Sequence, residues 1–200
     1  MVGARQFDER EVIAIALDVF WRKGLHDTSM QDLATATGVQ RGSLYNAYGD
    51  KEAIFLHAFD GYAARFLETV GRALARGDAA ARLRRFFDVI IVNMTSGSPP
   101  RGCLTTRTAL DAGMSSDAVR QRVRALLAQL ERVVGDAIRA APDGSPAIEP
   151  DRLARLVVTF TRGLAVMERA GYDRRQLKDI AASFVDGLMG ERGGGERGGR

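Results

Sequence analysis

The sequence predicts an all-α protein with two helical domains. Apolar residues recur at spacings of three and four along almost the whole chain, as they do on one face of an α-helix. No segment shows the alternation of β-branched and polar residues that marks a half-buried strand. The first three predicted helices are short and most of the later ones are long. We therefore place a domain boundary near Gly49, which gives domains at 1–50 and 51–190.

The N-terminal domain is predicted to contain three helices. The first begins after Asp8, a favourable N-cap residue, and ends at Gly24. The second begins at Thr28 or Ser29 and ends at Gly38, where a glycine permits the positive φ of a sharp turn. A third helix follows this turn directly.

The remaining helices are separated by clear breaks. Asp50 is expected to cap the fourth helix, and the proline- and glycine-containing stretches "TSGSPPRG" and "PDGSP" interrupt the later ones. The glycine-rich end at 191–200 is predicted to be a disordered tail. The helices from the third onward are expected over about 40–48, 51–75, 79–95, 104–112, 116–140, 150–170 and 174–189.

The composition excludes several classes of protein. No apolar run reaches the roughly 18 residues that a membrane span requires, and the charged start "MVGARQFDER" lacks the apolar core of a secretory signal. We therefore expect no membrane partner and a cytoplasmic location. The chain has one cysteine and two histidines, so neither a disulfide nor a metal site is expected. No nucleophile–base pair, carboxylate pair or nucleotide-binding glycine loop is found, which predicts neither an enzyme nor a cofactor.

The distribution of charge is uneven. The chain has a net charge of +4, but residues 1–50 hold five Arg or Lys against seven Asp or Glu. The first domain is therefore slightly acidic, and a general basic surface cannot explain binding to nucleic acid. If this domain binds DNA, a few well-placed side chains must do so.

The segment from the second to the third helix has the pattern of a helix-turn-helix. Ala34 is small enough to let another helix cross closely, and Gly38 lies four residues later. Leu33, Val39 and Leu44 are expected to form one small core. In such a motif the second helix is presented to the major groove of DNA. Its outward residues are expected to be polar ones that can contact bases or phosphates, namely Gln40, Arg41, Ser43, Tyr45 and Asn46, while Gly42 would permit close approach of the backbone.

A plain three-helix unit with a solvated polar face is the alternative explanation of this segment. A glycine turn alone would favour that alternative. The combined spacing of Ala34, Gly38, Val39 and Leu44, followed by an aromatic residue and a lysine, favours the helix-turn-helix instead.

The same stretch closely resembles the N-terminal domain of TetR-family transcriptional repressors. The resemblance covers about residues 8–60 and departs at Tyr48, where phenylalanine is commoner. It depends on the segment "FWRKGLHDTSMQDLATATGVQRGSLYNAYGDKEAIF", and in particular on Phe20, Gly24, Thr28, Ser29, Leu33, Ala34, Gly38, Val39, Gly42, Leu44, Tyr45, Tyr48, Lys51 and Glu52.

The resemblance implies a DNA-binding homodimer that recognises a palindromic operator. By this analogy, Thr28 and Lys51 would bind phosphates at helix starts, where free N–H groups help. Tyr48 joins the residues expected in or beside the groove. Arg5, ahead of the first helix, could add a flexible arm or could be disordered.

The resemblance also implies a dimer interface formed by the last two helices. Their apolar faces could pair with their symmetry mates as a four-helix bundle, or could be buried only within their own chain. The residues expected at the interface are Leu153, Val157, Phe160, Leu164, Ile180, Phe184 and Leu188.

A small-molecule effector site is expected in the second domain, again by resemblance. Each wall residue could equally be ordinary core, and Asn93, Arg107 and Arg162 could orient a ligand or lie on the surface. The expected lining is Phe59, Tyr62, Phe66, Phe86, Ile90, Met94, Cys103, Arg107, Leu110, Leu127 and Phe160.

Cys103 offers an alternative means of control. It follows the loop "SPPRGC" at a predicted helix start, with Arg101 nearby in sequence, and both features favour a thiolate. A redox- or electrophile-sensing repressor is therefore an alternative to a ligand-released one, and a small buried cysteine is the simpler explanation.

The leading hypothesis is a sequence-specific DNA-binding regulator, a repressor released by a small-molecule effector. A helical interaction module that does not bind DNA is the alternative from another class, and the acidic balance of residues 1–50 is the feature that favours it.

Overall fold

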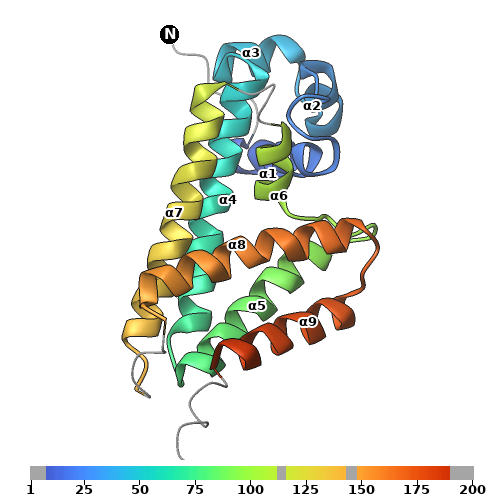
Figure 1. Cartoon of the computed structure of the whole chain (residues 1–200). Coiled ribbons are helices and arrows are strands. Elements are labelled where there is room, and N and C mark those ends of the chain that lie inside the picture. The colour runs from blue at the N-terminus through green and yellow to red at the C-terminus, as the bar shows by residue number, and fades with distance from the viewer. Residues whose placement is uncertain (1–7, 112–115, 143–147, 190–200) are drawn as a thin grey trace, which may run out of the picture. The chain divides into compact units, whose positions relative to one another are not determined.

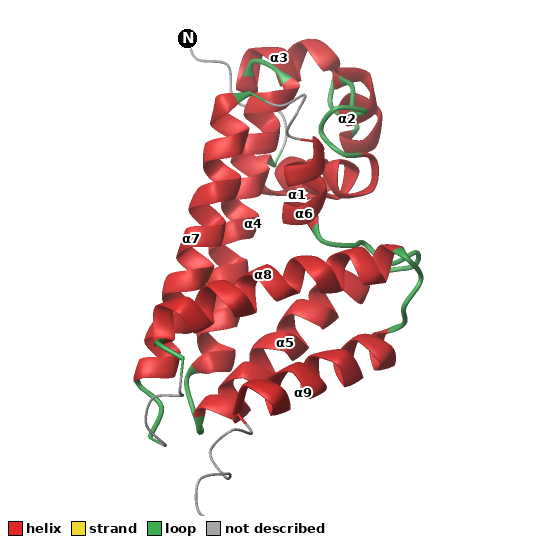
Figure 2. Cartoon of the chain, in the orientation of Figure 1, coloured by secondary structure: helices red, strands yellow, loops and turns green. Residues whose placement is uncertain are grey.

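The computed structural model describes residues 8–111, 116–142 and 148–189. Within these ranges the chain forms helices and no strand (Figures 1 and 2). No helix in the described residues is long and apolar enough to cross a membrane. The helices are α1 (Glu9–Lys23), α2 (Met30–Thr37), α3 (Arg41–Tyr48), α4 (Lys51–Leu74), α5 (Ala79–Thr95), α6 (Leu104–Leu110), α7 (Asp117–Arg139), α8 (Pro150–Arg169) and α9 (Arg174–Met189).

These bounds confirm the predicted all-α class and each expected helix to within two residues. Local capping chemistry explains the agreement. Asp8 caps α1 by accepting hydrogen bonds from the amides of Arg10 and Glu11, and Asp50 accepts from the amide of Ala53 at the start of α4. Such side-chain acceptors satisfy the N–H groups that a helix leaves free at its start. The predicted arm at Arg5 and the predicted tail at 191–200 lie outside the described residues.

The helix before the α2–α3 turn is capped at both of its ends. Ser29 and Asp32 form a complete capping box at the start of α2, and Gly38 ends that helix with a φ of 69°. This left-handed conformation is one that a β-carbon disfavours. Leu33 and Leu44 are fully buried behind the turn, whereas Val39 is half-buried. The small core expected here is therefore centred on the two leucines.

The described chain divides into two compact units. Unit 1 contains α1 to α3, α4 as far as Arg65, and the segment Leu104–Leu126. Unit 2 contains the segment Phe66–Cys103 and the chain from Leu127 onward. The expected boundary near Gly49 lies inside unit 1, since α4 packs on α1 there. The ring of Phe20 in α1 meets that of Phe55 in α4 edge to face, with centroids 5.2 Å apart.

In unit 2, α9 is bound along α5 by polar contacts. The two helices run side by side (Figure 1). Arg84 pairs with Asp186 at 2.5 Å and Lys178 with Asp88 at 2.8 Å. Arg174 adds a 2.8 Å hydrogen bond to the Thr95 hydroxyl at the end of α5. One side of α9 is therefore committed to its own chain.

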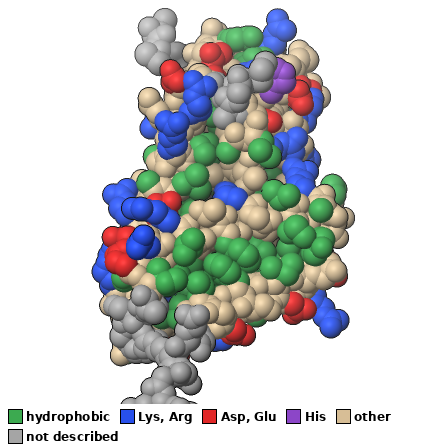
Figure 3. Space-filling view, in the orientation of Figure 1, with side chains coloured by type: hydrophobic (Ala, Val, Ile, Leu, Met, Phe, Trp, Pro, Cys, Tyr) green, Lys and Arg blue, Asp and Glu red, His purple; other side chains and the backbone are tan. Residues whose placement is uncertain are grey.

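An aromatic cluster fills the space between α5, α8 and α9. The rings of Phe160 and Phe184 stack with centroids 3.9 Å apart and an interplanar angle of 7°. Phe87 packs edge-on against both rings. Phe87 is buried, but Phe160 and Phe184 are only half-buried, so the stacked pair reaches the surface of unit 2. Figure 3 shows a band of apolar side chains over this region of α5, α8 and α9.

Candidate nucleic-acid interface

The outward face of α3 is polar and open to solvent. Gln40, Arg41 and Asn46 are exposed, Ser43 is half-buried, and 47% of the Tyr45 surface is accessible. Only Leu44 of this helix is fully buried. The structure thus brings the predicted base- and phosphate-contacting side chains together on one short helix. A helix of this size and polarity fits the major groove of duplex DNA.

Gly42 has no structural reason to be glycine. It lies in the first turn of α3, is exposed, and does not have a positive φ. A β-carbon built there would meet nothing within 4 Å. Glycine inside a helix destabilises it by roughly 0.5–1 kcal/mol relative to alanine. Nothing in the described chain therefore requires a glycine on this exposed face.

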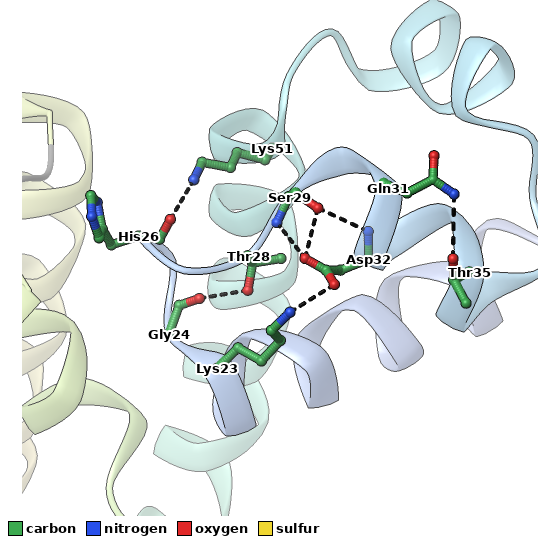
Figure 4. Close-up of polar contacts among 9 residues, drawn as sticks. All are labelled: Lys23, Gly24, His26, Thr28, Ser29, Gln31, Asp32, Thr35 and Lys51. Atoms are coloured by element: carbon green, nitrogen blue, oxygen red, sulfur yellow. Dashed lines mark hydrogen bonds and ion pairs between the residues drawn. The ribbon is translucent and has the colours of Figure 1, made fainter.

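The corner between α1 and α2 is held by side chains that bond its carbonyl oxygens (Figure 4). The Thr28 hydroxyl donates to the Gly24 carbonyl at 2.6 Å, and Lys51 Nζ donates to the His26 carbonyl at 2.8 Å. Lys51 comes from the start of α4, so it ties that helix to the corner. Its half-exposed ammonium has further N–H groups to offer a phosphate.

Two residues expected at the DNA are turned inward. Only 1% of Thr28 is exposed and its hydroxyl is used within the corner. The hydroxyl oxygen of Tyr48 is also buried, with its ring 6.2 Å from that of His57. Both hydroxyl groups are therefore buried within unit 1 in this structure. Ser29, the N-cap of α2, is the exposed residue at this end of the helix.

The start of α2 is fixed by an ion pair that sequence reasoning missed. Lys23 Nζ lies 2.7 Å from Asp32 Oδ1, and Asp32 also accepts hydrogen bonds from the Ser29 hydroxyl and amide. The bond from Lys23, followed by those from Ser29, holds the pKa of Asp32 well below its usual range. The sequence placed the helix start at Thr28 or Ser29, but it showed neither the role of Asp32 nor its partner from α1.

The residues predicted to line an effector site are mostly core. Phe59 and Tyr62 are buried in unit 1, and Phe66, Phe86, Ile90 and Met94 are buried in unit 2. Leu110 is 78% exposed, because α6 turns it away from the packed side of the helix. Leu127, Cys103 and Phe160 are half-buried in unit 2.

Arg107 and Arg162 also have defined positions. Arg107 Nη1 donates to the Trp21 carbonyl at 3.1 Å, and Arg162 Nη1 lies 3.6 Å from the Cys103 sulfur. Among the described residues, no group of three or more His, Cys, Asp or Glu is arranged to hold a metal ion.

The predicted dimer residues separate into two sets. Leu153, Val157 and Leu164 are fully buried within their own chain, so their side chains do not form the outer face of α8. The physical reason is that α8 carries apolar residues on two sides. Leu153, Val157 and Leu164 lie on the side that packs against the rest of the chain. Leu156, Gly163 and Val166 are exposed instead, beside half-buried Phe160. On α9, Ile180, Phe184 and Leu188 are half-buried, as an interface would require.

One surface feature has no counterpart in the sequence-based expectations. A cleft of about 920 Å³ opens between the first turns of α1 and the middle of α4. Its lining combines acidic and basic side chains with the apolar side chains of Ile13 and Ala14. Its residues are Asp8, Glu9, Arg10, Ile13, Ala14, His57, Gly61 and Arg65.

The fold and this exposed helix define a class of protein, the all-helical helix-turn-helix DNA-binding regulators. Comparison with known families identifies the particular one. The model described as "Bacterial regulatory proteins, tetR family" matches residues 12–58. The model described as "Tetracyclin repressor-like, C-terminal domain" matches residues 79–184, which is more than half of the chain. The chain therefore belongs to the TetR family and is a DNA-binding transcriptional regulator. The family consists of regulators and not of enzymes.

Similar proteins cover nearly the whole chain. The transcriptional repressor ComR of Escherichia coli is 25% identical over 90% of this chain and 88% of its own length. A cysteine mutant of the TetR-family regulator CifR, solved with 26-bp double-strand operator DNA, is 27% identical with a TM-score of 0.82, covering 91% of this chain and 97% of that one. Reduced NemR of E. coli has a TM-score of 0.81 at 15% identity, covering 90% of this chain and 95% of that one, and shows the fold alone.

Proposed function

We propose that this regulator is a homodimeric repressor that binds a palindromic operator through α3 and is released from it by a small-molecule effector. The observation that supports the DNA contact best is the exposed polar face of α3, with an unobstructed glycine at its centre. Two modest half-sites on one dimer offset the slightly acidic charge of each N-terminal domain. CifR, which is 27% identical, was solved on operator DNA, and ComR carries the name repressor.

Selection from a random duplex library tests this function directly. The expected product is a palindrome whose half-sites are about one helical turn apart. Its affinity should fall steeply as salt is raised, because each phosphate contact releases a counterion. A chain that enriches no sequence, and whose weak binding depends on salt alone, would contradict the proposal.

The second copy is proposed to dock on the outer face of α8 and the adjoining edge of α9. From Leu156 to Val166 the exposed positions of α8 are Leu156, Thr159, Gly163 and Val166, none of which is charged. Two of them, Leu156 and Val166, are large apolar residues, and large exposed apolar surface marks an interaction site. α9 is already bound to α5 by Lys178 and its neighbours, and Phe184, which packs on Phe87 of α5, keeps part of its surface open to a partner.

The effector is proposed to be a mostly apolar, aromatic-sized molecule that enters unit 2 beside α5 and α8. Phe86, Ile90 and Met94 of α5 are the walls, and Phe160 of α8 adds an aromatic surface. α4 is one continuous helix from Lys51 through Leu74. It begins in unit 1, which contains α2 and α3, and ends in unit 2. A ligand releases DNA only by preferring a state that binds DNA less well. Operator affinity measured with and without candidate ligands tests this.

Control through Cys103 is a second candidate, favoured by one contact. Arg162 Nη1 lies 3.6 Å from the half-buried sulfur, which belongs to the single cysteine of the sequence. Under this mechanism, Cys103→Ser abolishes the response to thiol reagents and leaves operator affinity unchanged. Under the effector mechanism, the serine variant still responds to the ligand, so the two can be separated in one titration.

A further inference from the structure

A distant arginine holds the end of α1. The last four carbonyl oxygens of an α-helix have no partner within the helix. In α1, the Phe20 carbonyl accepts from the Gly24 amide at 2.8 Å. The next one, of Trp21, accepts from Arg107 Nη1 of α6 at 3.1 Å. The guanidinium therefore lies at the negative end of the α1 helix dipole, where a cation is stabilising.

The end of α6 also packs on the bare backbone that caps α1. A β-carbon built on Gly24 would lie 3.1 Å from Arg107 Nε and 2.8 Å from Asp111 Oδ2. Gly24 has a φ of 85° as well. The turn therefore requires glycine here, and the absence of a β-carbon also lets these two side chains approach the backbone closely.

The corner that begins at Gly24 determines where α2 starts. Its carbonyls at Gly24 and His26 are held by Thr28 and Lys51, as described above. Together with the bond at Trp21, three carbonyls between residues 21 and 26 accept hydrogen bonds from side chains of α6, the corner itself and α4. Ser29, the N-cap of α2, follows immediately. This set of bonds therefore lies directly before the start of α2 and holds the backbone from which α2 and α3 continue.

The place of α6 along the chain links this contact to unit 2. The segment of unit 2 that contains α5 ends at Cys103, and α6 begins at Leu104 in unit 1. Arg107 lies only one turn of helix further on. α6 is thus joined to unit 2 by a single peptide bond and is bonded by a side chain to the corner beneath the DNA-binding helices.

We propose that Arg107 is a positioning residue for DNA recognition. It fixes the α1–α2 corner, and it makes operator affinity depend on the position of α6. This assigns Arg107 a role distinct from orienting a ligand, which was its predicted role. The inference rests on the proposed DNA function, because operator binding is its main readout.

The test compares Arg107→Met with a matched control, Arg85→Met. Arg85 is also half-buried, and its Nε donates at 2.8 Å to a carbonyl near a helix end, that of Ala73. It lies in unit 2. Both variants should lose a similar amount of thermal stability. Only Arg107→Met should lower operator affinity, by about tenfold, with little change for a scrambled duplex of the same length. Arg107→Lys, which keeps one donor, should restore part of the affinity.

Amide hydrogen exchange supplies a readout that needs no DNA. Arg107→Met should speed exchange in residues 21–29, and Arg85→Met should leave it unchanged. Operator affinity that is unaffected in Arg107→Met, or reduced equally in both variants, would overturn the inference. A wild-type chain that selects no duplex would instead refute the proposed function. In that case unchanged exchange at 21–29 would refute the positioning role as well.

Discussion

Lys23 Nζ and Asp32 Oδ1 lie 2.7 Å apart and join the end of α1 to the first turn of α2. Asp32 accepts from the Ser29 hydroxyl and amide at the same time. One carboxylate therefore completes a capping box and an ion pair between two helices. The orientation of the helix-turn-helix depends on it, although its side chain does not belong to the predicted DNA-contacting set.

Replacing Asp32 with asparagine should lower the melting temperature at neutral pH. The native pKa of Asp32 lies below its usual value of 3.8, mainly because Lys23 donates to it. Its contribution to stability is therefore fully present above 3.8 and is lost as the pH falls toward the depressed native pKa. The difference between wild type and Asp32→Asn should narrow toward about pH 3 in thermal unfolding followed by circular dichroism. Asp18→Asn, which removes an exposed pair with Arg22, is the control and should change little.

Substitution of Arg41 and substitution of Lys51 should change DNA binding in different ways. If Arg41 contacts a guanine edge, Arg41→Ala costs roughly 1–3 kcal/mol of operator binding and relaxes preference at one base pair. Lys51→Ala should weaken binding to every duplex and reduce the salt slope by about one, with an added loss on the operator because it also releases the His26 carbonyl. Equilibrium binding to the operator and to single-base variants at several salt concentrations distinguishes these results. An equal loss on every sequence for Arg41→Ala would make Arg41 a phosphate contact.

Gly42→Ala should separate folding from DNA binding. Nothing in the chain obstructs a β-carbon at Gly42, so the variant should be more stable by roughly 0.5–1 kcal/mol. Operator affinity should fall by about 1–3 kcal/mol, the usual effect of forcing a methyl group into a close contact. Gly71→Ala in α4 is the matched control, since its β-carbon also meets nothing within 4 Å. It should gain stability and keep its affinity. Unchanged affinity in Gly42→Ala would mean that the DNA backbone does not approach this position.

Val166→Glu should produce a folded monomer. Val166 is 55% exposed on the outer face of α8, so the charge is tolerated in a single chain. At an interface the same charge would be buried without a partner and would weaken association by several kcal/mol. Val92→Glu on α5, where the valine is 42% exposed, should leave the dimer intact. Sedimentation of both variants decides the matter, and a dimeric Val166→Glu would place the interface on another face.

The elements that sequence reasoning predicted well are those determined by nearby residues. Asp8, Ser29 and Asp50 cap their helices by bonding amides two or three positions away. Gly24 and Gly38 end theirs through a positive φ. Contacts between residues this close in sequence can be recognised from a short segment. For that reason the helix bounds and the helix-turn-helix were predictable.

Other features depend on partners that a short window does not contain. The donor to the Trp21 carbonyl comes from Arg107, which lies 86 residues further along the chain. In α8, Leu153 and Leu156 are equally apolar, and only the packed structure distinguishes the buried side from the exposed one. Thr28 has the residue type of a phosphate ligand, but its hydroxyl bonds the Gly24 carbonyl instead.

The interleaving of the two units has a consequence for biosynthesis. Unit 1 needs residues 104–126, which leave the ribosome only after the whole segment 66–103 of unit 2. A nascent chain that ends near Arg65 already contains α1, α2 and α3, but it lacks the arginine that holds the Trp21 carbonyl. Unit 1, which contains α2 and α3, is therefore completed late in translation. A half-made chain consequently has α3 in place before the side chain that bonds the end of α1 has been synthesised.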